Sequence, residues 1–145
     1  MKLLLALSSA VALFASVAVL PAEENNAEVQ SRKSALDLAA AFSNDGFKIR
    51  DGHWTSAMKS GDHALIAVNL YSGNQYWFSV GADVAPKKLS VEIYDETGRQ
   101  VLPERYDSGD KAAAGFSPTA SGQYFVSIGL IEGDPTTLSL IYSYK

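Results

Sequence analysis

The chain of 145 residues contains no cysteine, so disulfides, thiol catalysis and cysteine-based metal sites are excluded. Histidine is scarce, since His53 and His63 are the only two. Positive charge is also in short supply: 12 Lys and Arg against 16 Asp and Glu leave a net charge of −4. No basic cluster is larger than Lys87-Lys88, so a surface for nucleic acid or anionic lipid is not expected. The fold must therefore rely on its hydrophobic core.

A long apolar run occurs only at the start of the chain. Residues 3–20 are all apolar or small; Lys2 precedes them and a Pro-Ala pair with two glutamates follows. This layout predicts a secretory signal peptide over 1–22, cleaved after Ala18 or Ala22. The alternative is an uncleaved anchor, because the run is close to the shortest length that spans a bilayer. Its many Ala and Ser residues favour removal, and we expect a periplasmic or secreted protein without a stable membrane span.

The rest of the chain, roughly 120 residues, has the length of a single domain. Residues 23–33 are polar and charged, which predicts a flexible stalk. Ser34 lies three residues before Asp37, a spacing typical of a capping box, and predicts a short helix over 34–46. The sequence Asn-Asp-Gly at 44–46 ends that helix. Residues 47–145 are then expected to form a separate β-sandwich domain.

Beyond residue 46, apolar and polar residues alternate, and turns interrupt the pattern at short intervals. The predicted strands lie at 47–50, 53–58, 64–70, 75–80, 89–94, 99–102, 112–116, 124–128 and 138–144. Residues 103–110 carry many charges and are expected to be irregular. No crossover helix separates the strands, so the sheets should be antiparallel. The predicted fold class is mainly β: an antiparallel jelly-roll-like β-sandwich of about eight or nine strands, preceded by one short N-terminal helix.

Several strands also carry apolar residues on their second face. These residues are Leu65, Ala67, Trp77, Phe125 and Ile141. Exposing all of them on one sheet would create an unusually apolar patch. Either the helix covers this face, or the face is a binding surface, or the sheet closes into a barrel. Cover by the helix is favoured, because Leu36, Leu38 and Phe42 otherwise have nowhere to bury.

Short motifs between residues 60 and 144 stand in a characteristic order. They are the Ser-Gly-Asp turn at 60–62, Gly73 before Tyr76, the strand 89–95 with Gly98, and residues 115–116, 121–128 and 138–140. In these motifs the chain resembles the bacterial pre-peptidase C-terminal-like (PPC-type) modules. The resemblance implies a jelly-roll-like sandwich of the kind appended to secreted peptidases, some of which bind calcium or collagen. Two features depart from it: Lys87-Lys88 replace acidic residues, and no peptidase precedes the module.

The polar residues offer little for chemistry. His53 and His63 have Asp51, Asp62 and Ser56 nearby, yet both histidines stand beside turns, and no serine lies in a nucleophile elbow. We therefore expect no enzyme activity, no catalytic residues and no two-histidine metal site. Calcium is the one possible cofactor, because acidic turn residues supply the oxygen ligands it takes. These residues are Asp95, Glu96, Asp107, Asp110 and Asp134, whose spacing matches no known calcium loop.

The remaining candidates for a ligand site are Trp77, Phe125, Trp54 and Tyr94. Flat aromatic faces on a sandwich stack on sugars or contact peptides. We expect an exported, non-catalytic binding or accessory module that recognises a polysaccharide, a peptide or a partner protein in the envelope or the medium. The alternative is a structural or assembly component of a bacterial envelope complex, docked through the stalk and helix. A hydrolase acting through the histidines is a third hypothesis.

Overall fold

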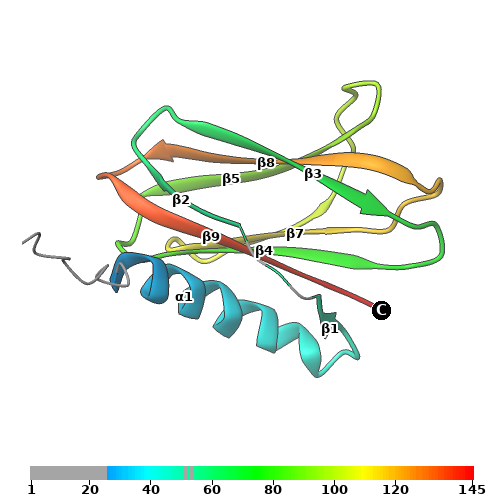
Figure 1. The fold of residues 1–145 in the computed structure, drawn as a ribbon, viewed down its shortest axis with the longest axis horizontal. Coiled ribbons are helices and arrows are strands. Elements are labelled where there is room, and N and C mark those ends of the chain that lie inside the picture. The colour runs from blue at the N-terminus through cyan, green and yellow to red at the C-terminus, as the bar shows by residue number, and fades with distance from the viewer. Residues whose placement is uncertain (1–25, 51, 53) are drawn as a thin grey trace, which may run out of the picture.

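The protein consists of two stacked antiparallel β-sheets, with one helix against the outer side of one of them (Figure 1). The computed structural model describes residues 26–50, 52 and 54–145. The predicted signal peptide, residues 23–25 of the predicted stalk, Asp51 and His53 lie outside these ranges. Within them, no helix has the length and apolar character needed to cross a membrane.

The larger sheet contains β1 (Lys48–Ile49), β2 (Trp54–Met58), β4 (Tyr76–Ala82), β6 (Glu104–Asp107), β7 (Lys111–Phe116) and β9 (Thr136–Tyr144). Its order is β1-β9-β4-β7-β6, and β2 also pairs with β9. The smaller sheet, called the open sheet below, has the order β3 (His63–Leu70), β8 (Gly122–Glu132), β5 (Lys88–Asp95). The described ranges thus hold nine strands and one helix, which confirms the predicted antiparallel sandwich with a preceding helix.

The core lies between the two sheets and follows from the alternation of the strands. In β8, the side chains of Tyr124, Val126, Ile128 and Leu130 are buried, while Phe125 and Ser127 are only half-buried. The larger sheet contributes Phe78, Val80, Leu138 and Leu140 to the same core, and the open sheet adds Leu70, Val91 and Ile93. Full burial of each large aliphatic or aromatic side chain contributes about 1.5–3 kcal/mol.

Helix α1 (Asn26–Ser43) begins earlier than predicted, so the prediction of a flexible stalk is wrong over residues 26–33. The capping box at Ser34 is also wrong, because this residue lies inside the helix. Over residues 26–33 the helix meets the sheet through a serine, whereas Val29, the one large apolar residue of this stretch, is exposed. The Ser31 hydroxyl is fully buried, 2.7 Å from the Ser139 hydroxyl, and donates to the Glu28 carbonyl.

The helix covers the outer face of β4 and β9, which confirms the predicted cover for Trp77 and Ile141. Ile141 is buried against Ala35 and Ala39. Of the apolar helix residues expected to bury, Leu38 does so, but Leu36 is exposed, because it lies on the side of the helix that faces solvent. Leu65, Ala67 and Phe125 belong to the other sheet, where no helix lies over them (Figure 1).

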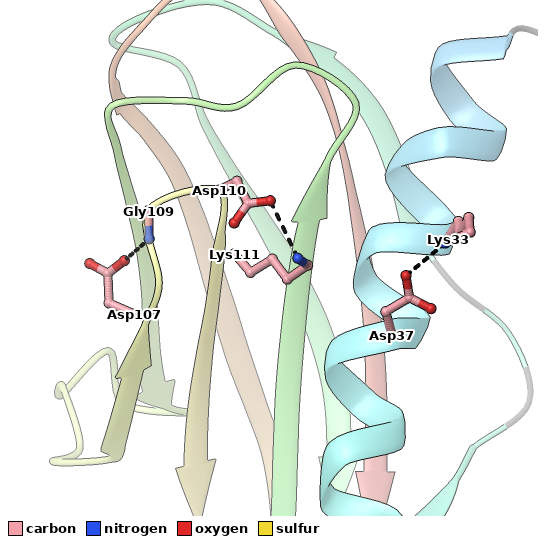
Figure 2. A network of polar contacts seen from close by, with 6 residues as sticks. All are labelled: Lys33, Asp37, Asp107, Gly109, Asp110 and Lys111. Carbon is pink, nitrogen blue, oxygen red and sulfur yellow. Dashed lines mark hydrogen bonds and ion pairs between the residues drawn. The ribbon is translucent and has the colours of Figure 1, made fainter.

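The predicted strand at 99–102 is wrong, and a strand lies instead in the stretch predicted to be irregular. Residues 99–101 run along the edge of β5, where the Val101 N–H donates to the Ile93 carbonyl (2.9 Å) and only Gln100 forms an isolated bridge. Leu102 is 93% exposed, so its apolar side chain packs nowhere. Strand β6 follows and joins β7 through a turn in which the Asp107 carboxylate accepts the Gly109 N–H and Asp110 pairs with Lys111 (Figure 2).

A charged contact links the edges of the two sheets. Both guanidinium nitrogens of Arg105 in β6 donate to the carboxylate of Glu92 in β5, at 2.7 and 2.6 Å. The hydrogen bond from Arg105 is the largest effect on Glu92 and lowers its pKa; burial opposes this, and the Gln100 amide adds to the lowering. This bidentate pair closes one side of the sandwich.

The Glu92–Arg105 pair predicts a dependence of stability on acid. Because the folded protein lowers the pKa of Glu92, the stabilisation is present above the ordinary value of 4.5 and is lost as pH falls through the folded value. Glu92→Gln should cost about 1 kcal/mol at pH 7 and little at pH 3, since the pair is partly exposed. Urea unfolding of the original protein and of Glu92→Gln between pH 3 and pH 7 measures whether their free energies of unfolding converge at low pH. Glu132→Gln, at the exposed 3.8 Å pair with Lys87, is the control; a constant deficit in Glu92→Gln would contradict the assignment.

Candidate functional site

The outer face of the open sheet presents two rows of side chains across its three strands. Ala67, Phe125 and Tyr94 stand in register in one row, and Leu65, Ser127 and Glu92 stand in the next. Side chains directly opposite one another on adjacent strands lie close enough to form one contact surface. Leu65 is 64% exposed, and the two aromatic residues are half-buried. The apolar side chains of this face therefore gather within two neighbouring rows.

The turn after β5 makes this face concave. The connection beyond Asp95 stands above the upper sheet in Figure 1, and with the sheet it borders a wide, open hollow of about 570 Å³. The lining residues are Leu65, Tyr94, Glu96, Thr97, Gly98, Phe125 and Ser127. Asp95 fixes the turn, because its carboxylate accepts the Thr97 hydroxyl (2.6 Å) and the N–H groups of Thr97 and Arg99. Gly98 takes the left-handed conformation (φ 81°) that the turn requires.

The turn gives the hollow an acidic rim. The hydrogen bond from the Thr97 hydroxyl is the main reason that the pKa of Asp95 is lowered, so this carboxylate is charged at neutral pH. The pKa of Tyr124 is raised, first by burial and then by the charges of Asp95 and Glu96. Its hydroxyl donates to the Ala120 carbonyl at 2.8 Å. The hollow thus combines an apolar floor with negative charge on one side.

Trp77, one of the predicted ligand residues, lies between the helix and the sheet. The Phe42 ring stacks on its indole at 4.2 Å, with 7° between the ring planes. A Cβ on Gly115 would stand 2.9 Å from three atoms of the six-membered ring, which places Gly115 against the other face of the indole. With Phe42 on one face and Gly115 against the other, Trp77 secures the helix, and its remaining surface lines a hollow of about 280 Å³ together with Phe116.

Trp54 lies at the edge of the sandwich, away from Tyr94 and Phe125. It pairs with Leu140 in β9 and packs against the core. It also lines a crevice of about 220 Å³ between the sheets, together with Ile66, Val68, Leu140 and Tyr142. The structure therefore brings only Phe125 and Tyr94 together among the four predicted residues. The sequence identified the turn at 95–98, but contained no signal that its Glu96 and Thr97 would overhang the apolar face.

The open sheet also brings His63 and Ser90 close to one another, on either side of Gly129. A Cβ on Gly129 would lie 2.7 Å from the His63 Nδ1 and 2.6 Å from the Ser90 Oγ. Nucleophilic catalysis also needs a group that orients the histidine, and among the described residues no carboxylate forms a hydrogen bond or ion pair with His63. In the same ranges no three His, Asp or Glu side chains stand close enough together to hold a metal ion.

Comparison with known proteins adds no assignment to this geometry, because no family description matches the chain and no curated protein matches it either.

Proposed function

We propose that this protein is an exported, non-catalytic binding or accessory module, and that the outer face of the open sheet is its binding surface. The observation that supports the proposal is the asymmetry of the sandwich. Helix α1 covers one outer face, whereas the other leaves Leu65, Phe125 and Tyr94 uncovered beside a hollow. The partner classes are a polysaccharide, a peptide or a protein in the periplasm or the medium. The signal-peptide layout of residues 1–22 supports the proposed location.

The chemistry of the face suits recognition. Apolar side chains grouped on a surface and rimmed by polar groups are typical of interaction sites. Aromatic residues supply much contact area at little cost in conformational entropy. Here the apolar floor has Glu96, Thr97 and Ser127 around it, which offer charge and hydroxyl groups for orientation. The two-sheet architecture is also consistent with a PPC-type module, an assignment that remains part of this proposal.

Docking of an envelope complex through the helix gains no support from the described contacts. The helix packs along β4 and β9 of its own chain, and buries Ala35, Leu38 and Ala39 there. A helix that is engaged in this way is not a free docking element. We therefore retain the open face as the single proposed site.

Leu65→Asp tests the binding surface, with Leu102→Asp as its matched control. Both leucines are exposed, so neither change should lower stability by more than about 0.5 kcal/mol. A charge at Leu65 places a desolvation cost in the middle of the face, and should weaken binding at least tenfold. Glycan arrays and pull-downs from envelope extract, followed by titration of the captured ligand, measure this. Equal binding by both variants, or no ligand in either assay, would contradict the proposal.

A further inference from the structure

Strand β3 is an edge strand without the features that usually prevent an edge from pairing. It has eight residues, pairs only with β8, and contains no proline, lysine, arginine, aspartate or glutamate. Its pairing with β8 is free of bulges. Natural sheets protect long edges with charge, proline, bulges or a covering segment. An edge left open in this way is a ready template for another strand.

Three of the other described edges of the sandwich are protected, whereas β2 pairs only with β9 and leaves a second, shorter open edge of five residues. Residues 99–101 cover β5 and donate the Val101 N–H to Ile93. Strand β6 has only four residues, three of them charged, and β1 has only two. The exposed side of β3, with eight residues, is therefore the longest unprotected edge among the described strands.

The register shows which backbone groups point toward this free side. The Leu130 N–H donates to the Asp62 carbonyl, so the 62–130 pair faces inward between β3 and β8. Because the direction alternates along an antiparallel ladder, the backbone groups of Ala64, Ile66 and Val68 also point to β8. Those of His63, Leu65, Ala67 and Asn69 point away from it, and no described group pairs with them. The edge thus offers a regular row of donors and acceptors.

An apolar crevice opens beside this row. It lies between the two sheets, where β2 and β3 diverge after the turn at 59–62 (Figure 1). Its volume is about 220 Å³, and Trp54, Ile66, Val68 and Leu140 supply apolar walls. One ordered water needs only about 10–15 Å³ measured in this way, so the crevice has room for an apolar side chain.

We propose that the free edge of β3 and the crevice bind an extended polypeptide of a partner chain, which adds a strand to the open sheet. This inference rests on the proposed binding function and names its partner class. Main-chain hydrogen bonds to Leu65 and Ala67 provide affinity, and one apolar side chain of the partner enters the crevice. The alternate side chains of the added strand lie beside Leu65 and extend the outer face of the sheet.

The row of backbone groups decides the occupant. A polysaccharide has no repeating amide donors and acceptors at the spacing of a strand. A second copy of this chain has the backbone groups, but the inward side chains of its β3, Ile66 and Val68, already line its own crevice. A separate extended segment satisfies both the edge and the crevice.

Ala67→Pro tests strand addition, because it removes an N–H that points away from β8 and leaves the β3–β8 ladder intact. Ala67→Val keeps that N–H and is the matched control. The probe is a fluorescent heptapeptide, Thr-Val-Thr-Leu-Thr-Val-Thr, whose central leucine is placed for the crevice. A second peptide carries alternate N-methyl groups, which remove its edge-facing donors without changing the protein. Fluorescence anisotropy with the purified chain gives affinity, and amide hydrogen exchange gives position.

We expect Ala67→Pro and N-methylation each to weaken binding at least tenfold, while Ala67→Val stays within about twofold. Exchange should slow at the amides of Leu65 and Ala67. Unchanged binding by the N-methylated peptide, or slowing confined to other strands, would overturn the inference. If the protein binds no peptide but does bind another ligand, and Leu65→Asp abolishes binding of that ligand, strand addition alone is overturned. Absence of every ligand would overturn the binding function as well.

Discussion

Removal of residues 23–46 is expected to unfold the sandwich rather than leave it intact. The deletion takes away Ala35, Leu38, Ala39 and Phe42, and uncovers the indole of Trp77 and the side chains on β4 and β9 beneath the helix. Loss of a buried leucine and a stacked phenylalanine alone costs several kcal/mol, at about 1.5–3 kcal/mol each. Because a domain of this size has only about 5–15 kcal/mol of net stability, much of it disappears.

Near-ultraviolet circular dichroism, urea unfolding and binding of a hydrophobic dye report the loss. The double variant Lys33→Ala, Asp37→Ala is the control. These two residues are one helical turn apart and form an ion pair on the solvent side of the helix (Figure 2). Exposed pairs of this kind contribute only about 0.3–0.5 kcal/mol. A truncated protein with cooperative unfolding near that of the full chain would show that the helix is dispensable for the fold. It would return the helix to consideration as a docking element.

The strands were predictable because period-two alternation and turn residues are local signals. Val126 and Ile128 alternate with half-buried Phe125 and Ser127 along β8, and this pattern needs no knowledge of the partner strands. Strand β6 escaped prediction because its four residues are all exposed, so only its pairing with β7 defines it. An edge of that kind leaves no apolar pattern in the sequence.

The start of the helix was missed for a related reason. Amphipathic helices are recognised by large apolar residues at helical spacing, whereas α1 packs closely through Ser31, Ala35 and Ala39. Small residues permit a close approach but give a weak pattern, and the polar residues before 34 consequently look like a stalk. The partner of Ser31 is Ser139, more than a hundred residues away.

The candidate site was predictable only in part. The alternation of side chains along each strand predicted that Tyr94 and Phe125 point outward, and the structure brings them together because their strands are neighbours. The same alternation predicted that Trp77 points outward, but the outer face of β4 is the one that the helix covers. Alternation separates inward from outward side chains within one strand. Which sheet a strand joins depends on contacts between residues far apart in the sequence, and alternation does not report these contacts. The open edge of β3 likewise became visible only with the sheet order.

Gly81→Ala is expected to produce the largest loss of stability from a single methyl group. A Cβ at Gly81 would lie 2.3 Å from the Ala35 nitrogen and 2.6 Å from the Ser34 carbonyl carbon. Both are helix backbone atoms, so relief requires the whole helix to lift from β4 and separates Phe42 from Trp77. We expect a loss of about 3 kcal/mol, the upper end for overpacking, and a melting temperature lower by about 10 °C.

Gly122→Ala separates this steric effect from the general effect of replacing a strand glycine. Gly122 also has no positive φ, and the nearest atom to its added Cβ is the Glu96 carboxylate, 4.0 Å away. Its stability should stay within about 1 kcal/mol of the original protein, because alanine reduces the entropy of the unfolded chain. Urea unfolding of both variants makes the comparison. If Gly81→Ala lost as little stability as Gly122→Ala, the helix could not lie against β4 at this distance. The conclusion that the helix covers the larger sheet and leaves the open sheet exposed would then have to be abandoned.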